Sequence, residues 1–187
     1  MGRDLTWKKL SSKYLLKDTW ATIRADSCEK PDGHIVEPYY VYEFPDWVTA
    51  IAFTKDGRVI LEKQYRHALA ETIYEIPGGC VDASDKDYEA AIARELLEET
   101  GYKFEKFEYL GRTSANPSTN TNTMHMFLAF DGELVAEQNL DAGEDLEVLF
   151  VSMDEFIDLF KQGAFVQAMH TTAIYLALQK LGRLTIV

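Results

Sequence analysis

Three glutamates in the middle of the chain are spaced so that their carboxylates could bind a metal ion. Glu95, Glu98 and Glu99 follow Arg94 in the run RELLEE. On a helix, residues three and four positions apart share a face, so the three carboxylates would converge within about two turns. Like charges so placed repel, and a hard dication that prefers oxygen ligands relieves the repulsion. The spacing therefore predicts a site for Mg²⁺, with Mn²⁺ as the alternative ion.

A double glycine upstream of the acidic run could add a further ligand. The stretch EIPGG occupies positions 75–79, and glycine lets the backbone come close to a bound group because it has no side chain. We expect the main-chain carbonyl of Gly78 to join the three glutamates as a metal ligand. Arg94 lies four residues before Glu98 and can hold its carboxylate in a fixed orientation.

These two segments together resemble the box of the Nudix hydrolase family. The box is a Gly, five residues, a Glu, seven residues and then Arg-Glu-apolar-any-Glu-Glu-any-Gly-apolar. With Gly79 as its first position, the stretch from Arg94 to Tyr102 matches at every fixed place. Asp85 stands where the family has Glu, and eight residues separate it from Arg94; a seven-residue spacing would place Lys86 there instead. We interpret the difference as a one-residue insertion in the loop before the helix.

The alternative for the acidic run is a solvent-exposed helix face without a function. An isolated Arg-Glu-x-x-Glu-Glu is more often such a face than a metal site. Here a predicted strand, the double glycine at the correct offset and Gly101 accompany the run. Their combination favours a metal site. In the mechanism that the box implies, Mg²⁺ neutralises a pyrophosphate and acidifies the water that attacks one phosphorus in line.

Outside the box, further segments resemble the ADP-ribose pyrophosphatase branch of the family. They are Trp47-Val48 before a strand, Gln64-Tyr65-Arg66 ending the next strand, Glu75-Ile76-Pro77 entering the box, and Pro117 sixteen residues after Gly101. The resemblance implies that ADP-ribose or another ADP-sugar is cleaved to AMP and a sugar phosphate. It also implies that the loop at Pro117 covers the terminal ribose, although a proline in Asn-Pro-Ser is equally a plain turn former.

Arg66, Glu75 and two tryptophans are the other expected substrate contacts. A guanidinium at a strand end could bind a phosphate through two hydrogen bonds, and a surface ion pair with Glu62 or Glu75 is the alternative. The resemblance implies adenine stacked between aromatic side chains, partly supplied by a second subunit, with Trp20 and Trp47 as candidates. Packing in the core is the competing use of each tryptophan.

The attacking water needs a base outside the helix, because a carboxylate bound to Mg²⁺ has a lowered proton affinity. ADP-ribose pyrophosphatases carry a catalytic Glu in the loop before the corresponding strand, and the acidic stretch at 141–145 resembles that loop. Glu144 is the closest match to that catalytic Glu and is the predicted base. Glu147 is the second candidate. Glu98 and Arg94 complete the expected catalytic set, and a solvated acidic loop is the alternative.

The composition narrows the classes of partner. The chain has 187 residues, of which 47% are hydrophobic, and a formal net charge of −12. An acidic excess argues against binding a nucleic-acid backbone, which requires clustered Lys and Arg. Cys28 and Cys80 are too few for a disulfide framework and lack a zinc spacing. Without a long apolar run or a signal segment, we expect a cytoplasmic protein with a small-molecule nucleotide substrate and no membrane partner.

The elements that must position these residues follow from apolar runs, alternation and turn signals. They predict strands at 20–25, 39–44, 48–54, 59–64, 70–76, 104–111, 123–130 and 146–151, and helices at 87–100, 152–162 and 165–181. Gly101 would end the first helix, and Ser152 with Glu155 has the spacing of a capping box. The predicted fold class is α/β, a Nudix-type α/β/α sandwich with a mixed sheet over residues 47–187. A small β-rich region at residues 1–46 precedes it, with a role in forming a homodimer.

Two alternatives to an ADP-sugar hydrolase stay open. One is a Nudix hydrolase of nucleoside triphosphates, dinucleoside polyphosphates or another nucleotide sugar, because the box fixes the reaction and not the leaving group. The other is a non-catalytic module that senses a nucleotide with the same fold. Such a module would be expected to lose a helix carboxylate, and this chain keeps all three.

Overall fold

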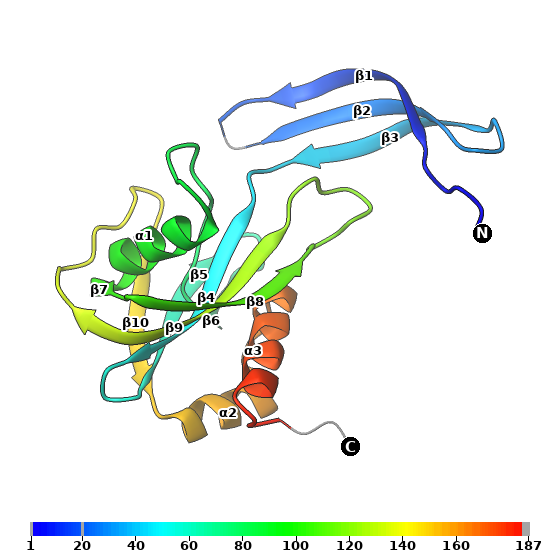
Figure 1. Cartoon of the computed structure of the whole chain (residues 1–187). Coiled ribbons are helices and arrows are strands. Elements are labelled where there is room, and N and C mark those ends of the chain that lie inside the picture. Colours follow the sequence, from blue (N-terminus) through cyan, green and yellow to red (C-terminus); the bar gives the residue numbers. More distant parts are fainter. Residues whose placement is uncertain (1, 20, 185–187) are drawn as a thin grey trace. The chain divides into compact units, whose positions relative to one another are not determined.

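The apolar and alternating runs after residue 46 form a mixed sheet (Figure 1). The computed structural model describes residues 2–19 and 21–184. The strands of this sheet are β4 (Trp47–Thr54), β5 (Val59–Arg66), β6 (Glu71–Glu75), β7 (Tyr102–Lys103), β8 (Lys106–Thr113), β9 (Met124–Leu134) and β10 (Leu146–Val151). Their order is β10-β5-β4-β9-β7, with β6 beside β5 and β8 beside β9. β4 and β9 run parallel while the other pairs are antiparallel, which confirms the predicted mixed sheet.

Helices cover both faces of this sheet. They are α1 (Tyr88–Thr100), α2 (Met153–Lys161) and α3 (Ala168–Lys180). α1 packs on one face through Ala91, Ile92 and Leu96, and α2 and α3 pack on the other, where Phe156 and Ile174 are fully buried (Figure 1). The predicted α/β/α sandwich is therefore confirmed.

The helix ends follow their local sequence signals. The Asp87 side chain accepts a hydrogen bond from the N–H of Ala90, and Gly101 ends α1 in the left-handed conformation with φ of 74°. A glycine adopts this conformation at little cost because it lacks a Cβ atom. Ser152 and Glu155 form the predicted capping box at the start of α2.

The N-terminal strands form a separate antiparallel sheet in the order β1-β2-β3. β1 spans Lys8–Lys17, β2 spans Thr22–Glu29 and β3 spans Ile35–Glu43. Strand β1 was not predicted from the sequence, and its Lys- and Ser-rich run is exposed along its whole length. No buried face imposes a period of two on such a strand, so its sequence carries no alternation to detect.

The chain divides into two compact units. The N-terminal unit comprises Met1–Pro45 together with Ser114–Asn122, and the main unit comprises Asp46–Thr113 together with Thr123–Val187. The later segment joins the N-terminal unit through hydrogen bonds, since the hydroxyl of Tyr39 donates to the carbonyl of Ser118 over 2.7 Å. The division at residues 46 and 47 that the sequence indicated stays a prediction.

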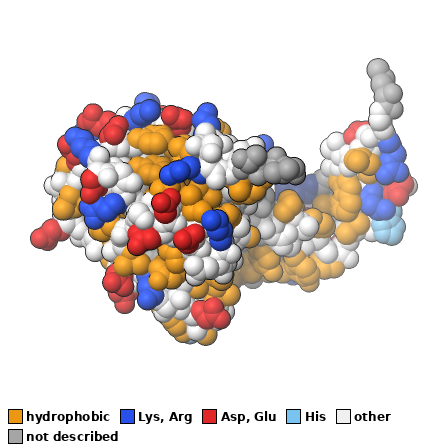
Figure 2. Space-filling view, turned by 90° about the horizontal axis from the view of Figure 1, so that it is seen from below, with side chains coloured by type: hydrophobic (Ala, Val, Ile, Leu, Met, Phe, Trp, Pro, Cys, Tyr) orange, Lys and Arg blue, Asp and Glu red, His pale blue; other side chains and the backbone are white. Residues whose placement is uncertain are grey.

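The surface carries charges of both signs. Figure 2 shows one face of the main unit, on which acidic and basic side chains are interspersed with hydrophobic ones. In the described part of the chain, none of the helices combines the length and the apolar character that crossing a membrane requires.

Candidate active site

Of the three predicted metal ligands on α1, Glu95 and Glu99 are buried, which contradicts the alternative of a solvated helix face. Glu95 is 7% exposed and Glu99 is 5% exposed, whereas the side chain of Glu98 is 38% exposed. Burial follows from position, because Glu95 and Glu99 flank Leu96, which faces the sheet. Carboxylates are seldom placed in such surroundings unless a partner compensates the charge.

Burial has a clear electrostatic consequence here. It raises the pKa of Glu95 to about 7, against the opposing charge of Arg94. Burial and then the charge of Glu62 raise the pKa of Glu99 well above its ordinary value. Glu62 itself, on β5, has a pKa raised to about 8 by burial and by the charge of Glu75. The site therefore concentrates more negative charge than its own cations offset.

Arg94 is the main cation beside these carboxylates. Its Nη1 lies 2.9 Å from Glu98 Oε2 and 3.1 Å from Glu95 Oε1. Its Nη2 also donates to the carbonyl of Cys80 over 2.9 Å. The contact with Glu98 is the one that the spacing of four residues predicted. Arg94 thus fixes two of the three carboxylates and ties α1 to the loop that precedes it.

Asp85 supplies the supporting acid despite the inserted residue. Its carboxylate receives hydrogen bonds from Nε and Nη2 of Arg94 at 3.1 and 2.9 Å, and its side chain is only 7% exposed. The backbone N–H of Asp82 donates to the same carboxylate over 2.8 Å. Lys86, the residue at the seven-residue spacing, is 88% exposed. The loop before α1 therefore absorbs the insertion and still presents an acid to Arg94.

Gly78 and Gly79 bring the backbone against the acidic helix face. The N–H of Gly78 donates to Glu99 Oε2 over 2.8 Å. A Cβ atom on Gly79 would lie 2.6 Å from Glu95 Oε1, and one on Gly78 would lie 2.2 Å from the carbonyl oxygen of Val48. Contacts this short are not tolerated, so any side chain at either position would displace the loop or the carboxylates.

The carbonyl of Gly78 is available to a ligand. The carbonyls on either side of it accept hydrogen bonds from β4, that of Pro77 from Ala50 N–H at 3.1 Å and that of Gly79 from Val48 N–H at 2.9 Å. Within residues 2–19 and 21–184, the carbonyl of Gly78 accepts no backbone hydrogen bond. One free carbonyl beside several carboxylates is a donor set that suits a hard cation such as Mg²⁺.

The carboxylates are held by other partners in this arrangement. Among the described residues, no three His, Cys, Asp or Glu side chains stand so that they could hold a metal ion. Arg94 and the N–H of Gly78 engage oxygens of the three glutamates. Mg²⁺ commonly uses one or two carboxylates and keeps several waters. The donor set therefore fits such an ion, provided that the side chains turn toward it.

A cavity of about 350 Å³ opens beside the glycine loop. Arg66, Trp47 and Gly78 are among the residues that line it. Nε and Nη2 of Arg66 lie 3.0 and 2.6 Å from Glu75 Oε2, and the arginine side chain is 46% exposed. Arg66 thus pairs with Glu75 and not with Glu62, while part of its guanidinium stays open to the cavity.

Two further residues of this cavity were not identified from the sequence. Gln167 donates a long hydrogen bond of 3.4 Å to Glu75, and His170 is 4% exposed. The backbone N–H of Ile76 donates to His170 Nδ1 over 3.5 Å, and burial lowers the pKa of His170 to about 3. His170 is therefore a neutral group of the site. Its helical position alone gave no signal, because only tertiary folding brings α3 to the glycine loop.

The predicted base lies near the acidic cluster. Glu144 is half-buried and its charge contributes to the raised pKa values of Glu95 and Glu99. Its carboxylate accepts a hydrogen bond from the N–H of Asp141 over 2.9 Å, which closes the acidic loop on itself. Glu147 is exposed on β10, opposite Lys63 of β5.

Pro117 and Trp20 are the remaining predicted contacts with the substrate. Pro117 is an exposed turn residue in the segment that groups with the N-terminal unit. Trp20 lies outside the described residues. Both assignments stay predictions.

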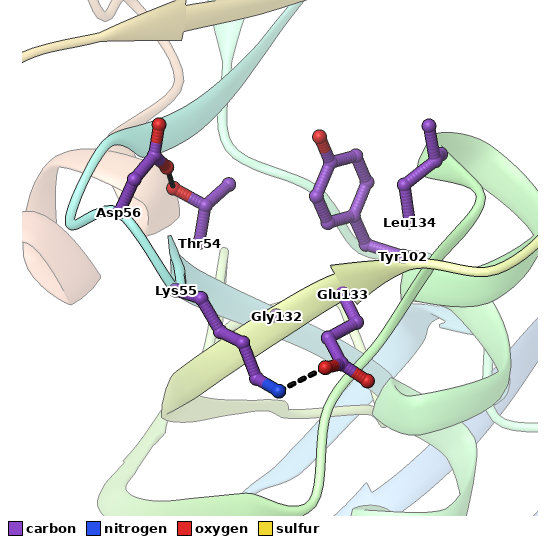
Figure 3. Close-up of a pocket in the computed structure, with 7 residues that line it drawn as sticks. All are labelled: Thr54, Lys55, Asp56, Tyr102, Gly132, Glu133 and Leu134. Carbon is purple, nitrogen blue, oxygen red and sulfur yellow. Dashed lines mark hydrogen bonds and ion pairs between the residues drawn. The ribbon is translucent and has the colours of Figure 1, made fainter.

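A larger hollow of about 530 Å³ lies elsewhere on the main unit (Figure 3). Its lining residues come from the turn after β4, from β7 and from the end of β9. Lys55 pairs there with Glu133, and Thr54 donates to Asp56. Because these charged groups already satisfy one another and the hollow is shallow, we assign the active site to the smaller cavity beside the glycine loop.

Comparison with known protein families agrees with this geometry. The family model described as NUDIX domain matches residues 44–170. The chain belongs to the Nudix family. A second model, described as nucleoside diphosphate sugar hydrolase N-terminal domain, matches residues 7–42 of this Nudix protein. The family that the box resembled is therefore confirmed.

Two relatives match this Nudix chain over almost its whole length. It is 28% identical to an ADP-ribose pyrophosphatase of Bacillus subtilis over 180 residues, covering 95% of this chain and 96% of the relative. It is 27% identical to a methanol dehydrogenase activator of Bacillus methanolicus, with coverage of 96% and 97%. The crystal structure of an ADP compounds hydrolase has the same fold, with a TM-score of 0.83 and 21% identity, and the match covers 98% of this chain and 100% of that one.

Proposed function

We propose that this Nudix protein hydrolyses the pyrophosphate of ADP-ribose or another ADP-sugar, releasing AMP and a sugar phosphate. The observation that carries the proposal is the meeting of three elements in one place. These are the buried carboxylates of α1, the glycine loop with its free carbonyl, and the cavity lined by Arg66. The names of the relatives, ADP-ribose pyrophosphatase and GDP-mannose pyrophosphatase, support a nucleoside diphosphate sugar as the substrate class.

Mg²⁺ is the proposed cofactor, and Mn²⁺ could replace it. Glu95, Glu98, Glu99 and the carbonyl of Gly78 would hold the ion. When bound, the dication neutralises the charge of the diphosphate and makes a nearby water more acidic. The fit rests on an all-oxygen donor set whose buried carboxylates lack compensating charge.

The chain itself binds and orients the substrate. Arg66 contributes the open part of its guanidinium to a phosphate, while Glu75 fixes the other part. Trp47 offers a flat surface in the same cavity. Arg94 keeps Glu98 and Glu95 in place as the substrate enters. Trp20 and the loop at Pro117 complete the proposed contacts with adenine and with the terminal ribose.

Glu144 is the proposed base. Its loop is acidic and contains a glycine, and it leads directly into β10, so that a small movement would bring the carboxylate toward a bound diphosphate. The base removes the proton from water as the oxygen attacks phosphorus opposite the leaving phosphate. Glu147 is the alternative base if the loop adopts another register.

The N-terminal unit is proposed to form a homodimer. Several large apolar side chains of its strands are exposed, among them Leu10, Leu15 and Tyr40 at 45%, 52% and 50%. Surfaces of this kind are usually covered by a partner. The expected partners thus remain a second copy and a small nucleotide, in a cytoplasmic protein that does not bind nucleic acids.

The proposal predicts a substrate order. ADP-ribose should be hydrolysed with a higher kcat/KM than any nucleoside triphosphate, because Arg66 and Trp47, which line the cavity, are the proposed contacts of the ADP part. Purified protein with Mg²⁺ would be given ADP-ribose, ADP-glucose, GDP-mannose, diadenosine polyphosphates and triphosphates, and the products identified by mass.

A preference for triphosphates in this panel would overturn the ADP-sugar assignment. A preference for GDP-mannose would favour the second candidate, which the 26% identity to the GDP-mannose pyrophosphatase of Escherichia coli supports. Tight binding of a nucleotide without any cleavage would indicate the sensing module instead.

A further inference from the structure

Glu62 is a buried acid that lies next to two other buried acids, Glu75 and Glu99. It lies in the middle of β5 and is only 3% exposed. Its Oε1 atom is fully buried and, among the described residues, has no hydrogen-bond partner. An unpaired buried carboxylate oxygen is costly to a fold, so its retention calls for a partner that is added later.

The side chain of Glu62 faces the acidic side of α1. Ile60, two residues earlier on β5, belongs to the core cluster that packs under α1, and side chains two residues apart on a strand share a face. Val148, directly opposite Glu62 on β10, packs on the same cluster. Glu62 thus points to the layer that contains Glu95 and Glu99. Its effect on the pKa of Glu99 agrees with this position.

On its other side, Glu62 meets a second acid. Glu75 of β6 is its direct partner in the sheet and is 1% exposed. Like charges directly opposite each other destabilise a strand pair. The nearby cations are already used, since Arg66 makes its hydrogen bonds to Glu75 and Arg94 makes its own to the acids of α1 and to Asp85. In the described part of the chain, Glu62 forms no salt bridge of its own.

We propose that Glu62 is a further carboxylate of the metal-binding cluster and shares a divalent cation with Glu99, extending the site from α1 onto β5. The box of the family does not include this position. The proposal rests on the metal-dependent function proposed above and adds a ligand to it. A dication between the two acids would supply the charge that Arg66 and Arg94 do not, and would give the unpaired Oε1 a partner.

The test is the affinity for Mn²⁺ alone, followed by the loss of the free-ion signal in electron paramagnetic resonance. The variants are Glu62→Gln, which keeps the size of the side chain, Glu99→Gln as the positive control, and Glu105→Gln as an exposed control with the same change in net charge. We expect Glu62→Gln to weaken Mn²⁺ binding by at least about tenfold, as losses around metal sites typically do. Glu105→Gln should bind like the wild type.

A second readout separates a ligand from a purely structural residue. The wild type should melt at a higher temperature with Mn²⁺ than without it, because binding to the native state alone stabilises that state. In Glu62→Gln this rise should shrink at the same Mn²⁺ concentration. Should the Gln variant fold poorly, Glu62→Leu replaces it, since Ile60 and Val148 next to this position pack in the apolar cluster under α1.

The outcomes distinguish this inference from the function on which it rests. If the wild type binds Mn²⁺, Glu99→Gln binds it weakly and Glu62→Gln binds it as the wild type does, the role of Glu62 is overturned and the Nudix site stands. If the wild type binds no Mn²⁺ at any concentration tested, the metal site itself is overturned, and Glu62 with it.

Discussion

Replacing Glu99 by Gln is expected to lower turnover by at least about a hundredfold while the fold survives. The change removes one negative charge from the proposed metal site without adding bulk. The amide keeps an oxygen that can still accept the hydrogen bond from the N–H of Gly78, so the loop should stay in place. Steady-state hydrolysis of ADP-ribose at saturating Mg²⁺ measures the loss of turnover. The melting temperature of the variant shows whether the fold survives.

Two comparisons make the Glu99 result interpretable. Glu98→Gln should lose a similar factor, because Glu98 is the exposed member of the three and the one best placed to meet an ion from solvent. Asp85→Asn should lose less, since Asp85 acts only by holding Arg94 and its amide retains one oxygen for that contact. If both glutamate variants melt normally and hydrolyse at the wild-type rate, the metal assignment is wrong.

The second large effect is expected at Glu144. Glu144→Gln should strongly reduce turnover, leave KM nearly unchanged and abolish the fall in rate at low pH that protonation of a base produces. The sign follows from the chemistry, because a base works only when it is deprotonated, and so the wild-type rate should rise with pH. The profile must be recorded at saturating Mg²⁺, since protons compete with the metal at Glu95, whose pKa is about 7.

Glu147→Gln is the matched control for this profile. It removes the same charge three residues further along and lies exposed on β10. A Glu144→Gln protein that keeps more than about a tenth of wild-type turnover, with its fall at low pH intact, would shift the role to Glu147 or to Glu98. The threshold is set by the usual contribution of general bases, about a hundredfold or more.

Helix α1 could be predicted closely from the sequence because its signals are local. Asp87 and Gly101 mark the two ends of the helix, and its apolar residues mark the side that is buried. All of them lie within one segment of the chain. Tyr88, the first residue of α1, is 37% exposed although it is aromatic. Its ring stacks on His125 with centroids 3.5 Å apart, and its hydroxyl donates to Asp46. That contact joins distant parts of the chain, so helical periodicity could not reveal it.

The parts of the site that escaped prediction depend on tertiary neighbours. The sequence suggested Glu62 only as a possible ion-pair partner of Arg66, because nothing in its own segment shows that Glu75 lies opposite it in the sheet and that Glu99 lies nearby. His170 could not be identified from its own helix either, because its neighbours in the cavity come from distant parts of the chain. Conversely, Asp85 lies one residue away from the spacing of the family's box. The turn in which the N–H of Asp82 donates to Asp85 nevertheless places the carboxylate of Asp85 against Arg94. Loop conformation compensates for an insertion in a way that counting residues cannot.

Water at the proposed metal site of α1 is expected to cleave between the two phosphates of an ADP-sugar. Hydrolysis of ADP-ribose in H₂¹⁸O with Mg²⁺, followed by mass analysis of both products, tests it most directly. The expected products are AMP and ribose 5-phosphate in equal amounts, with one ¹⁸O atom in the phosphate of one of them, and turnover should stop when Mg²⁺ is chelated. Release of ADP and free ribose, or ¹⁸O in the sugar hydroxyls, would contradict it.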